Sequence, residues 1–228
     1  MIDCFFKDKQ VTLTMASTQI VSTMQNKAAQ KKAIHHSSST VFLALFSPDG
    51  DIDTEISLLN HFILKRGIAD VIASVEIRHI NGTLVKSFKL CMNEERAYSI
   101  RVGEHVSTAF TGSVYVYFES NENLAVPFCA VMCSIKSVNS VCGVHTYGRR
   151  LEQKELGQAL DLDNTVETGW TTRDSDIIKS FAALHGGAFE LNLSVELEIS
   201  NYKNEKILIQ RKFKLEPFGT LLIIPQNL

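Results

Sequence analysis

Alternation of apolar and polar residues runs through much of the chain and predicts β-strands. Residues 75–80 (VEIRHI) alternate with a period of two, and residues 83–90 (TLVKSFKL) follow them after Asn81-Gly82. Asn-Gly between two such runs is the strongest short-range hairpin signal, because both residues tolerate a positive φ. We therefore expect a β-hairpin here.

A similar arrangement returns near the end of the chain. Residues 197–202 and 206–210 again look like two strands joined by a turn. The matching pieces are 88–90 with 213–215 (both FKL) and 42–45 with 181–184 (FLAL and FAAL). This predicts an internal duplication in which residues 41–102 and 180–224 superpose strand for strand. The alternative is that short-stranded β domains share such patterns without being duplicated.

About a dozen short strands with turn signals between them predict an all-β protein built from two β-sandwich units. The aromatic run 112–119 has no charge before Glu119, so we expect it in the middle of a sheet or at a homo-oligomer interface. The expected domains are a polar, weakly structured N-terminal arm (1–38), a first sandwich unit (39–150), a linker (151–165) and a second sandwich unit (166–228).

Composition narrows the classes of partner and compartment. The 228 residues carry a net charge of −2, so nothing in the charge balance indicates nucleic acid or an anionic membrane as a partner. The N-terminus shows no signal-peptide pattern. Five cysteines form an odd number without a regular framework, which indicates free thiols and a cytoplasmic location.

The layout of an apolar strand, a hairpin, a Phe-x-Leu segment, a turn and a Ser-x-Ile segment resembles bacterial β-sandwich proteins of the sensory rhodopsin transducer type. The residues that carry the resemblance are 41–45, 75–80, 88–90, 98–102 and 112–127, roughly half of the chain. The resemblance implies a small, oligomeric, non-enzymatic sandwich that binds partners or small ligands.

The sequence contains no motif that establishes catalysis, metal binding or cofactor binding. Cys129, Cys133, Cys142 and His145 lie close in sequence, but the first two are about 13 Å apart along one strand face, too far for two ligands of one zinc ion without a bulge. Cys142 and His145 would face opposite sides of a regular strand, against a nucleophile–base pair. Neither a phosphate loop nor a G-x-S-x-G elbow occurs. We expect no metal and no cofactor.

The predicted ligand site combines aromatic and arginine side chains on both sides of the linker. It consists of His145, Tyr147, Arg149, Trp170 and Arg173, with the only tryptophan in a polar loop. Aromatic faces and guanidinium donors suit a sugar or an anionic partner. The simpler alternatives are a tryptophan that plugs the gap between two sandwiches and a solvated strand end at His145.

Two functions follow, from different classes. The first is a non-catalytic β-sandwich binding or assembly module for a small molecule, a carbohydrate or a protein partner, including a second copy of the chain. The alternative is a carbohydrate-active or sugar-modifying enzyme on a β scaffold, because fold alone cannot separate the two.

Overall fold

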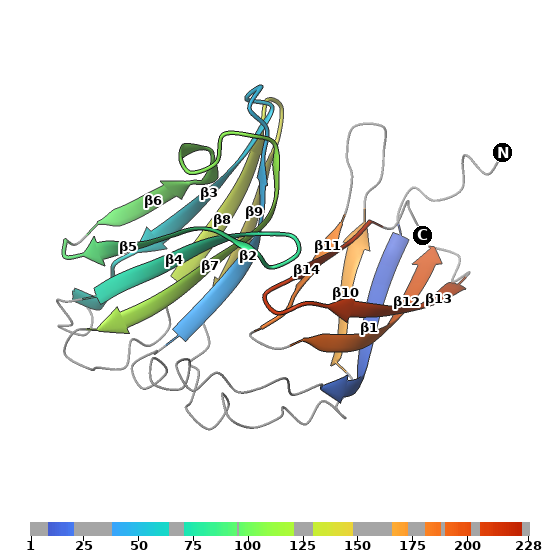
Figure 1. Ribbon diagram of the computed structural model, residues 1–228. Coiled ribbons are helices and arrows are strands. Elements are labelled where there is room, and N and C mark those ends of the chain that lie inside the picture. Colours follow the sequence, from blue (N-terminus) through green and yellow to red (C-terminus); the bar gives the residue numbers. More distant parts are fainter. Residues whose placement is uncertain are drawn as a thin grey trace. The chain divides into compact units, whose positions relative to one another are not determined.

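The computed structural model describes residues 9–20, 38–63, 71–94, 96–120, 130–147, 166–172, 181–187, 190–201 and 206–224. The regular elements of this part of the chain are strands, apart from one 3-10 turn, η2 (Val102–Glu104), and two helical residues, 62–63, so the expected all-β class is confirmed (Figure 1). In the same residues no helix is long and apolar enough to cross a membrane. The chain divides into a central unit (24–158) and a terminal unit (1–23 with 159–228).

The central unit consists of two four-stranded antiparallel sheets. The first has the order β2-β7-β4-β5, with β2 (Ser38–Phe46), β7 (Phe110–Ser120), β4 (Val71–His79) and β5 (Leu84–Met92). The second has the order β6-β3-β8-β9, with β6 (Ala97–Arg101), β3 (Ile52–Leu59), β8 (Ala130–Ser137) and β9 (Val141–Tyr147).

The core of the central unit lies between the two sheets. The alternate residues of β4 are fully buried, and β3 contributes Ile56 and Leu58 from the facing sheet. These residues of β4 are Val71, Ala73, Val75 and Ile77, and the other strands add Phe42, Tyr98, Ile100, Val114, Val116, Phe118, Val131, Cys133 and Ile135. Each fully buried aliphatic side chain stabilises the fold by about 1.5–3 kcal/mol, so the period of two decides which face points inward.

The predicted Asn-Gly hairpin is present between β4 and β5. The N–H of Gly82 donates to the carbonyl of His79, and Gly82 has a φ of 87°. Asn81 keeps a negative φ and instead accepts a bond from the N–H of Thr83 through its side chain. The pairing register shifts between Ile77 and Arg78, as in hairpins that close with a glycine bulge. Only one of the two turn residues therefore uses the left-handed region.

Strand β7 lies between β2 and β4, which confirms the expectation that the aromatic run lies inside a sheet. Its backbone is paired on both sides from Gly112 to Phe118. It therefore presents no free edge.

The terminal unit also contains two antiparallel sheets. One has the order β10-β1-β12-β13, with β10 (Val166–Thr172), β1 (Lys9–Ile20), β12 (Leu191–Asn201) and β13 (Lys206–Leu215); the other pairs β11 (Ala182–His185) with β14 (Thr220–Ile223). The core joins them: Val195 of β12 and Ile223 of β14 are buried among Leu184, Ile209 and Phe213.

The N-terminal segment is not the separate polar arm that the sequence predicted for residues 1–38. Residues 9–20 form β1, which is paired with β10 on one side and with β12 on the other. The many Thr, Gln and Ser residues of this segment do not show the alternation of a strand. The strand forms nevertheless, because its backbone is paired on both sides and this pairing does not depend on the side chains. Residues 151–165, the expected linker, lie outside the described residues.

The two units share one order of strand pairing. The pairs β2–β7, β7–β4, β4–β5 and β3–β6 correspond to β10–β1, β1–β12, β12–β13 and β11–β14, all antiparallel. Strand β1, the first along the chain, takes the place in the terminal unit that β7 takes in the central unit. Whether the units are a duplication, as the repeated Phe-Lys-Leu suggests, stays a prediction.

A proline in β1 is expected to destabilise the terminal unit alone. Leu13 is paired with Thr168 and with Leu197, so Leu13→Pro removes a donor from a strand that has neighbours on both sides. We expect a loss of roughly 3 kcal/mol, the upper end of ordinary single-substitution effects. Trp170, the only tryptophan, lies in β10, so its fluorescence during denaturant unfolding reports this unit.

The matched control is Ser113→Pro in β7, which occupies the corresponding place in the central unit. This variant should leave the midpoint of the Trp170 transition where it is in the wild type. An unchanged midpoint in Leu13→Pro would show that β1 is not part of the folded terminal unit.

Candidate functional site

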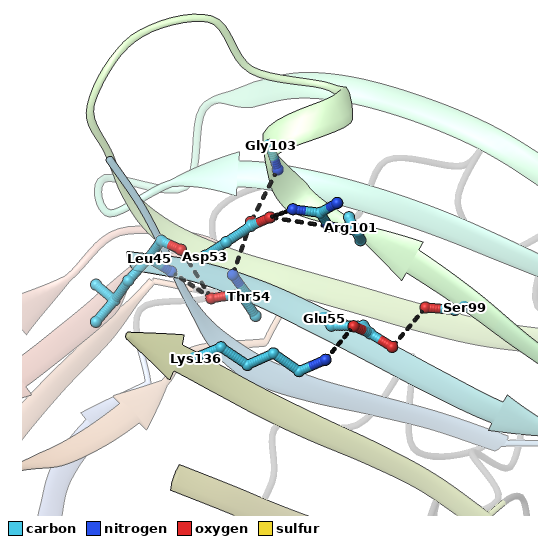
Figure 2. A network of polar contacts seen from close by, with 8 residues as sticks. All are labelled: Leu45, Asp53, Thr54, Glu55, Ser99, Arg101, Gly103 and Lys136. Atoms are coloured by element: carbon cyan, nitrogen blue, oxygen red, sulfur yellow. Dashed lines mark hydrogen bonds and ion pairs between the residues drawn. The ribbon is translucent and has the colours of Figure 1, made fainter. Parts of the chain in front are cut away.

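Strand β3 carries two carboxylates on the outer face of its sheet. Thr54, Ile56 and Leu58 are buried, whereas Asp53 and Glu55, which alternate with them, are partly exposed. Because successive residues of a strand point to opposite faces, the two carboxylates lie side by side on the outer surface. The neighbouring strands supply cations to this surface, as Figure 2 shows.

Asp53 fixes the end of β6 and the η2 turn. Its Oδ2 accepts bonds from Arg101 Nη2 at 2.9 Å and Nε at 3.2 Å. Its Oδ1 accepts the backbone N–H groups of Gly103 at 3.0 Å and Thr54 at 2.8 Å. The carboxylate thus joins β3 to the turn that follows β6.

Glu55 joins β3 to both of its neighbours. Its Oε1 accepts the hydroxyl of Ser99 at 2.8 Å, and its Oε2 pairs with the ammonium of Lys136. The hydrogen bonds from Lys136 and then Ser99 lower the pKa of Glu55. In the strand register Glu55 is opposite Arg101 and Asp53 is opposite Lys136, so both ion pairs run diagonally across the sheet.

A polar depression of about 320 Å³ opens over this network. It is lined by Gly50, Asp53, Glu55, Arg101, Lys136, Ser137 and Val138. Its two carboxylates and two cations balance each other, and Glu55 stays ionised at neutral pH, so it is not the proton donor that glycoside hydrolysis requires. The arrangement suits hydrogen bonding to a polar partner.

Below this network, Thr54 closes the free edge of β2. Its hydroxyl accepts the N–H of Leu45 and donates to the carbonyl of Leu45, both at 2.8 Å (Figure 2). The thiol of Cys133 donates to the carbonyl of Leu43 at 3.8 Å. The edge groups of β2 that its partner β7 does not use are thus bonded to side chains of the facing sheet at these two residues.

Two of the other three edges of the central unit are protected in common ways. Strand β5 carries Lys86 and Lys89, and β6 is only five residues long and ends in Arg101. Lysines and short length both discourage pairing with another chain.

Strand β9 is the fourth edge, and it has no such protection. It contains no Asp, Glu, Lys, Arg or Pro, and its residues 141–145 are exposed. The side chains of Val141 and Val144 are 65% and 45% exposed, and Val138 in the preceding turn is 72% exposed. Charge-free, apolar edges of this kind are where another strand adds to a sheet.

The direction of the β9 backbone follows from the β8–β9 turn. The N–H of Ser137 donates to the carbonyl of Ser140 at 2.7 Å, so these two residues form a hydrogen-bonded pair. Antiparallel pairs alternate between hydrogen-bonded and non-hydrogen-bonded, and Lys136 is opposite Val141. The peptide groups of Val141, Gly143, His145 and Tyr147 therefore point away from β8. We call these outward groups the β9 edge.

The described residues of the predicted site belong to two different units of the chain. His145 and Tyr147 lie in β9, opposite Met132 and Ala130 of β8. Trp170 lies in strand β10 of the terminal unit, opposite Val11, and not in a loop as predicted. Arg149 and Arg173 lie outside the described residues, and the shared cleft stays a prediction.

The cysteines of this region are thiols. Cys91, Cys133 and Cys142 are free. Burial raises the pKa of Cys133 to about 12, and the nearby Cys142 raises it by a smaller amount. In the part of the chain that the structure describes, no group of three or more His, Cys, Asp and Glu side chains is placed to hold a metal ion. Cys133 therefore behaves as a small core side chain and not as a reactive thiolate.

Sequence reasoning missed both Asp53/Glu55 and the β9 edge. The signal for the carboxylates was present: Ile52-Asp53-Thr54-Glu55-Ile56 alternates and places both acids on one face. The sequence carries no corresponding signal for the β9 edge, because the order of strands within a sheet comes from tertiary pairing.

No family model and no curated protein matches the chain. A solved structure from Bacteroides fragilis, of a protein whose assignment as a β-galactosidase is itself provisional, matches 94% of this chain and 34% of its own, with 14% identity and a TM-score of 0.21. The chain spans about a third of that protein's length, and so low a TM-score carries no argument. The resemblance to the sensory rhodopsin transducer type stays a prediction.

Removing the Asp53 carboxylate is expected to cost more stability than removing the Lys136 ammonium. Asp53→Ala leaves two backbone N–H groups and one guanidinium without their acceptor, which should lower the free energy of unfolding by about 1–3 kcal/mol. Lys136→Ala breaks an exposed pair and should cost at most about 1 kcal/mol. Denaturant unfolding followed by circular dichroism measures both, and equal losses would contradict this ranking.

Lowering the pH below 6.5 is expected to destabilise the terminal unit through His185. Its Nδ1 lies 2.9 Å from Thr220 Oγ1, and burial lowers its pKa from 6.5 to about 4. Between these values the unfolded chain binds a proton that the folded unit does not, so stability is highest above pH 6.5 and falls towards pH 4.

The test is the Trp170 unfolding midpoint as a function of pH in the wild type and in His185→Gln. The difference between the two curves isolates His185 from the carboxylates that titrate at lower pH. His145→Gln, in the central unit, is the matched control and should reproduce the wild-type curve. Parallel curves for wild type and His185→Gln would contradict the prediction.

Proposed function

We propose that the chain is a non-catalytic β-sandwich binding or assembly module that contacts a protein partner through the β9 edge. The observation that carries the proposal is the contrast between this edge and the other three of the central unit. Side chains of the facing sheet bond the edge of β2, lysines protect β5, and shortness limits β6, whereas β9 presents outward peptide groups between exposed valines. Strand addition supplies affinity through main-chain hydrogen bonds.

The chemistry of the polar depression supports binding over catalysis. Its acids are held in ion pairs, and the pKa of Glu55 is lowered, whereas a catalytic acid needs a raised pKa. The depression also adjoins the β9 edge, because Lys136, Ser137 and Val138 line it and lead into β9. A partner strand on β9 thus has hydrogen-bonding groups beside it. A sugar-modifying enzyme is the alternative, with this depression as its contact for carbohydrate.

The proposal predicts that Gly143→Pro abolishes strand addition without unfolding the protein. Gly143 is opposite Ser134 in a non-hydrogen-bonded pair, so its backbone N–H points away from β8 toward a partner strand, and a Cβ at this position would meet no atom within 4 Å. Proline is tolerated at such positions of edge strands. The probe is an uncharged heptapeptide of alternating threonine and valine, titrated into nanomolar fluorescently labelled protein so that self-association does not compete. We expect saturable binding to the wild type and at least a tenfold loss in the variant, about 1.4 kcal/mol.

Val144→Pro is the matched control. Its N–H points to Cys133 of β8, so the same substitution one residue later should lower the thermal midpoint, whereas Gly143→Pro should leave the midpoint nearly unchanged. Absence of peptide binding by the wild type would refute the β9 edge as a contact surface. Hydrolysis of a chromogenic β-galactoside by the purified chain would refute the non-catalytic assignment.

A further inference from the structure

We infer that the partner strand is β9 of a second copy of this chain, paired antiparallel about Val144 so that the two β6-β3-β8-β9 sheets form one continuous sheet. This inference rests on the proposed function of the β9 edge and names its occupant. It follows from the charge of the strand, the direction of its backbone and the shape of its two faces.

Charge favours a second copy over a charged segment of another protein. Residues 141–147 contain no acidic or basic side chain apart from His145, so two copies of β9 meet without like charges opposite each other. A basic or acidic partner strand would gain no ion pair from β9. The copy of β9 in a second chain presents the same exposed valines and likewise has no Asp, Glu, Lys or Arg.

The backbone permits a symmetric register. A two-fold axis perpendicular to the sheet at Val144 places Val141 opposite Tyr147 of the second copy and Gly143 opposite its His145. All four residues direct their peptide groups outward, so each of these pairs is hydrogen-bonded. Val144 faces its own copy in a non-hydrogen-bonded pair, where side chains approach most closely. This register uses the whole length of β9.

The outer face of this pairing fits in shape. A Cβ built on Gly143 would have no atom within 4 Å, so there is open space over this residue. In the register about Val144 the imidazole of the second copy's His145 lies beside that space. Aromatic side chains across from a glycine in an edge strand cover its exposed backbone. The predicted site residues His145 and Tyr147 thereby become interface residues.

The inner face continues the core. Cys142 and Val144 are opposite Ile135 and Cys133, which are buried, yet both are exposed on β9. The apolar layer of the sandwich therefore extends to the β9 edge without a cover. Pairing with a second copy places the two Val144 side chains against each other on this layer. Both are then removed from water, which is favourable for apolar surface.

The experiment uses the full-length chain with Val144→Lys and Val144→Glu, followed by sedimentation velocity over micromolar concentrations. We expect a dimer for the wild type and monomers for each variant alone, because like charges then lie directly opposite each other. Mixing the two variants should restore a dimer, since the introduced lysine and the introduced glutamate lie opposite each other only in the register about Val144. Val85→Lys, in β5 of the other sheet of the central unit and outside the paired strand, is the control and should remain dimeric.

A wild-type monomer at all concentrations would overturn the inference, as would a dimer that survives Val144→Lys. Failure of the mixed variants to associate would overturn the register about Val144. The peptide titration distinguishes these outcomes from failure of the proposed function: a monomeric wild type that still binds the threonine–valine heptapeptide retains the β9 edge as a contact surface and loses only the second copy as its occupant.

Discussion

Each border strand of a sheet has peptide groups that its single neighbour cannot bond, and how they are satisfied organises this protein. In the central unit the facing sheet supplies the partners for β2: Thr54 bonds both peptide groups of Leu45, and Cys133 bonds the carbonyl of Leu43. These contacts fix one sheet against the other at the same time as they close an edge. Burial of alternate apolar residues then holds the two layers together.

In the terminal unit, a segment distant in sequence supplies the neighbour that two strands would otherwise lack. Its sheet would be split between β10 and β12 if β1 did not lie between them. Because the four strand pairings match those of the central unit, β1 and β7 occupy equivalent places although they differ in their order along the chain. Each unit therefore has a strand paired on both sides at this position.

Among the described residues of the central unit, β9 is the edge strand that has neither lysines, nor short length, nor bonds from the facing sheet to protect it. The diagonal ion pairs of Asp53 and Glu55 hold β6, β3 and β8 in register beside it, which keeps the adjoining polar surface in one shape. Binding to such an edge requires little rearrangement, because its backbone is already extended. An ordered edge next to a charge-balanced surface is suited to recognition of another strand.

The sequence by itself determined the all-β class and the Asn81-Gly82 hairpin, because side-chain alternation and turn preferences act over a few residues. It also indicated that the aromatic strand β7 lies inside a sheet. It did not determine that β1 belongs with β12, that Trp170 lies in a strand, or that β9 is an edge. Those features depend on pairing between residues far apart in sequence, such as Val11 with Ile199, whose backbone hydrogen bonds are indifferent to side-chain pattern. Only the tertiary structure decides which strand lacks a neighbour.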